Sequence, residues 1–235
     1  RVARKYKVIL VSDEIYGELH HRGQHVSIAR FYPEGTLISG GLSKWCGAGG
    51  WRLGTFTFPH ALRWLLETMA IVASETYTST SAPIQYAAIR AFEGGMEIEQ
   101  YLAQSRRVLR HLGRHVWRRL QTCGARVSEP VGAFYLFPDF SALRGKLAER
   151  GIRDSAKLCT TLLEETGVAT LPGVDFGRPL DELTLRLAYV DFDGARALVA
   201  AQQLPPGKEL DKAFLELYCP NVVHAMEALS RWMQQ

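Results

Sequence analysis

Cysteine is scarce in this sequence, and the four cysteines that occur lie far from one another. They are Cys46, Cys123, Cys159 and Cys219. Their spacing offers neither the close pairs of a zinc site nor the dense pattern of a disulfide framework, and it is typical of a reducing compartment. We therefore expect no metal site and a cytoplasmic location, with a mitochondrial location left open.

Long apolar runs and a strong charge of one sign are also missing. No stretch approaches the ~20 apolar residues that a membrane span needs, and no secretory leader is visible. The net charge of +4 and the pI of about 8.9 are too modest to indicate a nucleic-acid binder. Because 47% of the residues are hydrophobic, as in ordinary globular chains, we expect a folded protein. The modest charge and the lack of long apolar runs predict no nucleic-acid or membrane partner.

The glycine-rich stretch 40–54 lacks both common phosphate-binding motifs. A nucleotide-triphosphate loop needs Gly-Lys-Ser/Thr, whereas here Lys44 follows Ser43 and precedes Trp45. A dinucleotide fingerprint needs a third glycine where this sequence has Arg52. A lysine in a glycine-lined segment is still suited to another chemistry, the formation of a Schiff base with an aldehyde cofactor.

Five short motifs occur in order along nearly the whole chain. They are Asp13-Glu14-Ile15-Tyr16, Ser43-Lys44 with Gly50-Trp51-Arg52-Leu53-Gly54, Gly132-Ala133-Phe134-Tyr135, Gly167-Val168-Ala169 through Pro172-Gly173, and Leu185-Arg186-Leu187-Ala188-Tyr189. In this order they resemble the fold-type I pyridoxal-phosphate enzymes, and among these the class I and II aminotransferases of the aspartate aminotransferase type. Each motif alone is modest, but the five together make the resemblance specific.

The resemblance implies a role for each polar residue of the first two motifs. Lys44 would form the Schiff base with pyridoxal 5'-phosphate and then move the substrate proton. Asp13 would pair with the pyridine nitrogen of the cofactor, and Tyr16 would donate a hydrogen bond to its phenolic oxygen. Arg52 would bind the phosphate through its forked guanidinium group, with Ser43 assisting.

Arg186 is the one charged residue in the apolar stretch 185–189, so it needs an anionic partner if it is buried. The resemblance names the α-carboxylate of the substrate as this partner. The implied function is transfer of an amino group between an amino acid and a 2-keto acid. Two alternatives stay open, because the same residues serve them: a lyase, synthase or decarboxylase of the same fold, and a non-catalytic cofactor-binding domain of a regulator.

The order of strands and helices indicates an α/β fold. We expect residues 1–100 to form the second half of a doubly wound, mostly parallel sheet domain that binds the cofactor. Residues 101–235 should hold a bridging helix and a smaller α+β domain. Apolar spacing predicts a helix over 60–72 and the bridging helix over 96–120, which carries an apolar stripe. Residues 125–128 and 133–137 predict a pair of strands. The apolar run 8–11 predicts a strand buried on both faces. Residues 36–39 predict a second strand, so that Lys44 follows the carboxyl end, where open α/β sheets bind ligands.

Some features of the resembled family are absent from this sequence. The phosphate-binding glycine/serine turn, the aromatic residue that stacks on the ring and an asparagine near the phenolic oxygen would all precede Asp13. The chain also begins without an initiator methionine. We therefore expect the carboxyl-terminal portion of a longer protein, weak or inactive alone. No arginine lies near Thr76, where aspartate-specific members of one branch have one, and Thr80 would reach a second subunit in a homodimer with shared active sites.

Five histidines are expected at the surface, without a functional role. His20, His21 and His25 lie in a loop-like segment with no carboxylate or cysteine at ligand spacing. His111 and His115 share a helical face, but the glutamate of a zinc-protease motif is missing between them.

Overall fold

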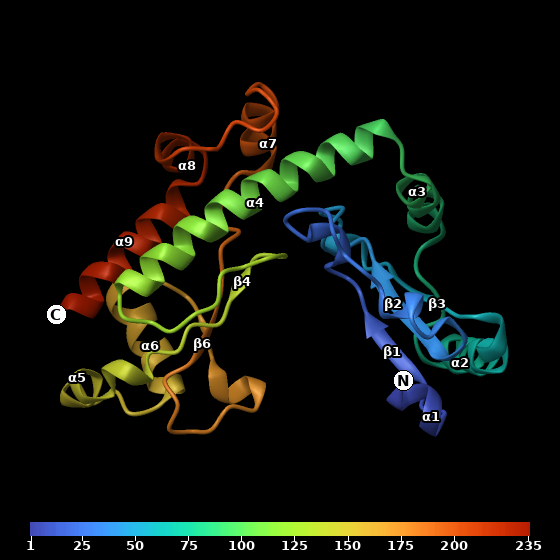
Figure 1. The fold of residues 1–235 in the computed structure, drawn as a ribbon, viewed down its shortest axis with the longest axis horizontal. Coiled ribbons are helices and arrows are strands. Elements are labelled where there is room, and N and C mark those ends of the chain that lie inside the picture. The colour runs from blue at the N-terminus through green and yellow to red at the C-terminus, as the bar shows by residue number, and fades with distance from the viewer. The chain divides into compact units, whose positions relative to one another are not determined.

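The computed structural model describes residues 1–235, which form two compact units, Arg1–Ala103 and Gln104–Gln235 (Figure 1). A single long helix, α4 (Met96–Thr122), contributes its first turns to the first unit and the rest to the second. None of the helices combines the length and the apolar character that a membrane crossing requires. Each unit is described by itself below.

The first unit is built on a sheet of three strands, β1 (Leu10–Asp13), β2 (Thr36–Gly41) and β3 (Gly54–Thr57), in the order β1-β2-β3. β1 and β2 are parallel, and Asp13 is paired with Ser39. β3 returns antiparallel to β2, with Gly54 opposite Gly41. As a result, the carboxyl ends of β1 and β2 and the amino end of β3 lie at the same edge of the sheet.

A glycine at the end of β2 allows the two antiparallel strands to approach closely. Gly41 has a φ of 153°, and a Cβ atom at this position would lie 2.6 Å from the carbonyl oxygen of Leu53. Any side chain would therefore collide with backbone that cannot move away. Leu42, the next residue, is fully buried, and its N–H donates to the same Leu53 carbonyl. This pairing closes the loop that carries Lys44.

The remaining elements of the first unit are helices. They are α1 (Val2–Tyr6), α2 (Arg63–Thr76) and α3 (Ala82–Glu93), together with short 3-10 turns. Glycines follow α3, and Gly94 and Gly95 have positive φ values of 72° and 119°, which end this helix before α4 begins. The helix expected over 60–72 begins as a 3-10 turn at His60–Leu62 and continues as α2 to Thr76.

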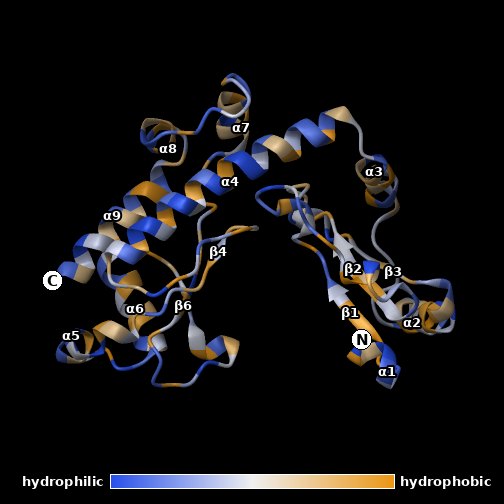
Figure 2. Ribbon diagram, in the orientation of Figure 1, coloured by the Kyte–Doolittle hydropathy of each residue, from blue (hydrophilic) through white to orange (hydrophobic).

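The prediction that residues 8–11 form a strand buried on both faces is wrong in the structure of residues 1–235. β1 is an edge strand of the sheet, and Val8 and Val11 are 49% and 64% exposed. α2 likewise has no buried residue although its sequence is rich in apolar side chains. Figure 2 shows the hydrophobic colouring of both elements. A run of apolar residues indicates that a strand is suited to burial, but it does not supply the neighbour that would cover it.

The second unit has a small antiparallel sheet and five helices that follow α4. The strands are β4 (Tyr135–Leu136), β5 (Leu171–Pro172) and β6 (Leu185–Ala188), in the order β4-β6-β5. The central strand β6 pairs Ala188 with Tyr135 of β4 and Arg186 with Leu171 of β5. The helices are α5 (Arg144–Glu149), α6 (Ser155–Thr166), α7 (Gly194–Gln202), α8 (Lys212–Tyr218) and α9 (Pro220–Gln234).

The core of this unit lies between the sheet and the helices. α4 contributes the fully buried Leu112, Val116 and Leu120, as expected from its apolar stripe, and α9 packs against α6 and α8. Aspartate side chains cap three of the helices: Asp154, Asp193 and Asp211 each accept a hydrogen bond from a backbone N–H in the first turn.

The strands of the second unit are shorter than the sequence indicated. Of the pair expected over 125–128 and 133–137, only Tyr135–Leu136 is a strand. The first segment contributes a single bridge between Arg126 and Asp139. A strand-like sequence pattern carries no information on how many of its residues find a hydrogen-bonding partner.

Candidate active site

The site residues of the first unit gather where β1 and β2 end. Asp13 is the last residue of β1, and its carboxylate accepts hydrogen bonds from the Ile15 N–H at 3.3 Å and the Ser39 hydroxyl at 3.4 Å. Both bonds are long, so most of the acceptor capacity of this carboxylate is still available. Because the side chain is exposed, it can accept a further donor without moving.

Tyr16 and Lys44 meet at this edge although they come from different loops. The Lys44 ammonium lies 5.8 Å from the centroid of the Tyr16 ring, within the range of a cation–π contact. Both residues are half-buried. No carboxylate of residues 1–103 lies within ion-pair distance of Lys44, so its amine is not committed to a salt bridge.

The loop between β2 and β3 folds back on itself and brings its two ends together. The Ala48 N–H donates to the Leu42 carbonyl at 3.2 Å, and the Leu42 N–H donates to the Leu53 carbonyl at 3.3 Å. Lys44 and Arg52 therefore begin and end the same closed loop. Ser43, expected to assist at the phosphate, is half-buried within it.

Arg52 has a left-handed backbone, with a φ of 54°. This conformation is rare for a residue with a long side chain. Its guanidinium group is exposed and donates to the Gly49 carbonyl at 3.1 Å, and the Thr80 hydroxyl donates to the Arg52 carbonyl at 3.4 Å. Thr80, which was expected to reach a second subunit, thus also contacts this loop of its own chain.

Glu14 is a feature of the site that the sequence reasoning missed. Its carboxylate accepts hydrogen bonds from the hydroxyls of Ser12 at 2.9 Å and Ser27 at 2.6 Å and lies 2.8 Å from Nε2 of His25. Burial alone would raise the pKa of Glu14, but the hydrogen bonds from Ser27, His25 and Ser12 outweigh it and hold the pKa below its ordinary value. The loop 17–27 is thereby tied to the end of β1.

The expectation that the histidines lie at the surface is wrong for two of them, His21 and His111, whereas His25 is exposed as expected but has a partner. His25 pairs with Glu14, and its ring occupies the space that a Cβ on Gly17 would need, since that Cβ would lie 2.8 Å from the ring. His21 is buried, with 5% of its surface exposed. His111 is also buried within α4, and burial, followed by the nearby arginines, lowers its pKa. None of these pairings follows a local spacing that a sequence could reveal.

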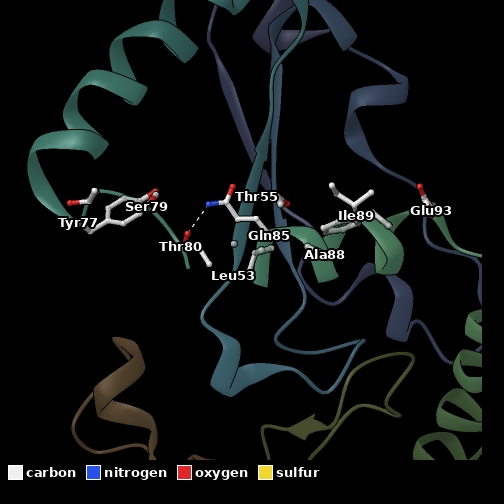
Figure 3. Close-up of a pocket in the computed structure, with 12 residues that line it drawn as sticks. Leu53, Thr55, Tyr77, Ser79, Thr80, Gln85, Ala88, Ile89 and Glu93 are labelled. Carbon is white, nitrogen blue, oxygen red and sulfur yellow. Dashed lines mark hydrogen bonds between the residues drawn. The ribbon is translucent and has the colours of Figure 1, made fainter. Parts of the chain in front are cut away.

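A pocket of about 680 Å³ is lined by residues 53–55, the segment 77–80 and α3 (Figure 3). Its floor is apolar and comes from α3, with Ala88, Ile89 and Phe92. Hydroxyl groups of the segment 77–80 line another side, and Gln85 donates to the Thr80 carbonyl at 2.6 Å. The residues expected to bind the cofactor, Lys44, Asp13, Tyr16, Ser43 and Arg52, do not line this pocket, whereas Thr80 does.

Arg186 belongs to the second unit, on the central strand β6. It is half-buried, and its guanidinium carbon lies 4.8 Å from the centroid of the Tyr135 ring and 4.7 Å from that of Phe176. No carboxylate of residues 104–235 lies within ion-pair distance of it. An arginine that lies close to two aromatic rings and has no counter-ion in its own unit is available to bind an anion.

The fold and these residues agree with a defined family of known proteins. Residues 1–201 match the family model described as aminotransferase class I and II. The aspartate aminotransferase of Geobacillus stearothermophilus is 35% identical over 192 residues, which cover 80% of this chain and 46% of that protein. The asparagine–oxo-acid transaminase of Streptococcus mutans is 31% identical over 204 residues, with the same two coverages.

Solved structures give the same result. A double mutant of the aspartate aminotransferase of Thermus thermophilus superposes with a TM-score of 0.75 and 27% identity over 98% of this chain and 50% of that one. The aromatic aminotransferase of Pyrococcus horikoshii superposes with a TM-score of 0.74 and 25% identity over 99% of this chain and 53% of that one. The chain is thus an α/β protein of the fold-type I class. It belongs to the class I and II aminotransferase family and spans about half the length of the relatives it matches.

Proposed function

We propose that the protein of which this chain is part is a pyridoxal-phosphate-dependent aminotransferase, which moves an amino group between an amino acid and a 2-keto acid. The observation that carries this proposal is the position of Lys44. Its amine lies beside Tyr16, at the edge of the sheet where Asp13 ends the parallel strand β1. A family relationship without this arrangement would support the fold but not the chemistry.

The side chains present fit the cofactor group by group. An aldehyde needs a primary amine, a pyridine nitrogen needs a carboxylate, a phenolic oxygen needs a donor and a phosphate needs a cation with several N–H groups. Lys44, Asp13, Tyr16 and Arg52 supply these four at one edge of the first unit. The unpaired Lys44 amine and the weakly bonded Asp13 carboxylate leave free the two atoms that the cofactor would contact.

When bound, the cofactor supplies an electron sink that stabilises negative charge at the substrate's Cα atom. Asp13 would hold a proton on the pyridine nitrogen, because a carboxylate at this place favours the positively charged form. Tyr16 would donate a hydrogen bond from its hydroxyl to the phenolic oxygen, while Arg52 and Ser43 would bind the phosphate. The Lys44 amine would take up the proton from Cα and return it at a different atom, as a general base and then as a general acid.

Arg186 would bind the α-carboxylate of the amino acid by two parallel hydrogen bonds. Its position on a central strand supports this role, because a strand fixes a side chain more firmly than a loop does. We propose further that the whole protein is a homodimer and that the segment around Thr80 approaches the site of the second subunit.

The proposal is tested by trapping the lysine. The protein is incubated with pyridoxal phosphate, reduced with borohydride, digested and analysed by mass spectrometry. We expect a stable adduct on Lys44 in the wild type and none in Lys44→Ala, with Lys146 unmodified in both. In addition, an amino acid and a second keto acid should exchange their amino group. An adduct without this exchange would indicate a lyase or decarboxylase, and no adduct in the full-length protein would overturn the proposal.

A further inference from the structure

We propose that Tyr135 and Phe176 form an aromatic clamp that positions the guanidinium group of Arg186 to bind a planar carboxylate through its edge. This inference rests on the proposed function, in which Arg186 binds the substrate. It adds two positioning residues that the five motifs alone do not assign, and it concerns the second unit only.

The clamp consists of two rings that both lie close to the guanidinium group of Arg186. The Tyr135 and Phe176 centroids lie 4.8 Å and 4.7 Å from the guanidinium carbon, inside the distance at which a cation is attracted to a ring. Tyr135 comes from β4, which pairs with β6 on one side, and Phe176 comes from the 3-10 turn after β5, which pairs with β6 on the other side. The two neighbours of the central strand therefore each contribute one ring.

The turn that carries Phe176 is held firmly against β6. The Gly173 N–H donates to the Thr184 carbonyl at 2.9 Å, and the Val174 N–H donates to the Ser155 hydroxyl at 3.3 Å. A Cβ on Gly173 would overlap the Thr184 hydroxyl oxygen and lie 3.0 Å from the Thr184 carbonyl oxygen, so a glycine is needed for this close approach. Phe137 packs edge-on against Phe176, with 5.7 Å between centroids and an interplanar angle of 88°.

Because the two rings come from segments on opposite sides of β6, the proposed clamp places one ring against each face of the guanidinium group and leaves its in-plane N–H groups to an anion. A carboxylate matches this fork with two parallel hydrogen bonds, whereas a lysine ammonium offers a point charge with no preferred plane. Because the side chain is already held, less conformational freedom is lost when the anion binds.

The clamp also explains how a half-buried arginine persists without a counter-ion in its own unit. A guanidinium group between two aromatic faces is stabilised by their negative potential. It therefore needs no permanent carboxylate, which would compete with the substrate. A structural salt bridge at this position would satisfy the charge but would also block the edge.

The experiment uses the full-length protein with its cofactor and titrates pyruvate, a carboxylate that carries no amine and so cannot transfer one. Binding is followed by the ¹⁵N–¹H signal of the Arg186 Nε, which is assigned by its loss in Arg186→Lys. We expect Phe176→Leu to raise the Kd of pyruvate about five- to tenfold and to shift the Nε signal in the free protein. The matched control is Tyr218→Leu, because this ring packs against Phe214 in the same unit, with 4.7 Å between centroids, and is no part of the clamp. It should change the Kd less than twofold.

Two further variants separate the possible outcomes. Tyr135→Phe keeps the ring and should bind pyruvate as the wild type does, whereas Tyr135→Leu should behave as Phe176→Leu does. Thermal unfolding followed by circular dichroism identifies any variant that fails to fold. If Arg186→Lys loses pyruvate binding but Phe176→Leu and Tyr135→Leu retain it within twofold, the clamp is wrong and the role of Arg186 stands. If Arg186→Lys binds pyruvate normally, the proposed role of Arg186 fails, and the clamp fails with it.

Discussion

The ammonium group of Lys44 lies 5.8 Å from the centroid of the Tyr16 ring. The two residues follow different strands, and the parallel pairing of β1 with β2 brings them together. The contact places the phenol hydroxyl and the amine in one half-buried region. The residue that would form a hydrogen bond with the cofactor, Tyr16, therefore lies next to the residue that would react with it, Lys44.

Replacing Tyr16 by Phe tests the tuning role while the ring beside Lys44 is kept. The Tyr16 hydroxyl would donate a hydrogen bond to the negatively charged phenolic oxygen of the cofactor. Without this bond the oxygen attracts the proton on the nearby Lys44 nitrogen more strongly, so the pKa of that nitrogen rises. We expect the pH midpoint of the cofactor's absorbance change to rise by about one unit, since a hydrogen bond to a charged group contributes about 1.5 kcal/mol. Spectra recorded from pH 5 to 10 measure it, and an unchanged midpoint would exclude contact between Tyr16 and the cofactor.

The carboxylate of Glu14 should make a pH-dependent contribution to stability. Its pKa is lowered from 4.5 in the folded chain, so the contribution is fully present above pH 4.5 and is lost as the pH falls through the folded-state pKa. We expect Glu14→Gln to lower the free energy of unfolding by about 1 kcal/mol at pH 7, with the difference from wild type shrinking below pH 4.

Urea unfolding at a series of pH values measures this difference. Glu67→Gln is the matched control, because Glu67 forms only an exposed ion pair with Arg63 on α2. An exposed pair of this kind contributes about 0.5 kcal/mol or less. Equal effects of the two substitutions would show that the three hydrogen-bonding partners of Glu14 contribute no stability.

Gly41 should tolerate no side chain. In Gly41→Ala the new Cβ would lie 2.6 Å from the Leu53 carbonyl oxygen, on a backbone with a φ of 153°. We expect a loss of about 2 kcal/mol in the free energy of unfolding and weaker cofactor binding, because Lys44 follows three residues later. Gly50→Ala in the same loop has no heavy atom within 4 Å of the new Cβ, so chemical denaturation should show a much smaller effect.

The sequence predicted those parts of the site that depend on neighbours along the chain. The apolar segment 36–39 followed by glycines indicated a strand that ends just before Lys44, and β2 extends from Thr36 to Gly41. The contact between Glu14 and His25 could not be predicted in this way, because 11 residues separate them and no periodic pattern relates a loop histidine to a strand end.

Burial was harder to predict than secondary structure. The apolar character of residues 8–11 is suited to a strand with neighbours on both sides, yet β1 has one neighbour, β2, in this chain. Hydrophobicity records the surroundings in which a segment is stable, whereas exposure depends on which other segments are present. The same reasoning applies to α2, which is apolar in sequence but has no buried residue.

Arg52 allows a test of whether backbone strain is retained for function. Its φ of 54° is costly for arginine but acceptable for asparagine. We expect Arg52→Asn to raise the free energy of unfolding of the cofactor-free protein by about 0.5–1 kcal/mol. The same substitution should weaken the binding of pyridoxal phosphate about tenfold, because the charged fork is lost.

Lys7→Asn is the matched control for this prediction, because Lys7 has a φ of 52° and ends α1, in a segment without expected site residues. It should gain similar stability while cofactor affinity stays unchanged. Urea unfolding and fluorescence titration with pyridoxal phosphate give the two quantities for both variants. If Arg52→Asn gained stability and bound the cofactor as the wild type does, the left-handed arginine would have no role at the phosphate. A gain in stability with a loss of affinity at position 52 alone would show that the strain is the cost of placing a guanidinium group at this turn.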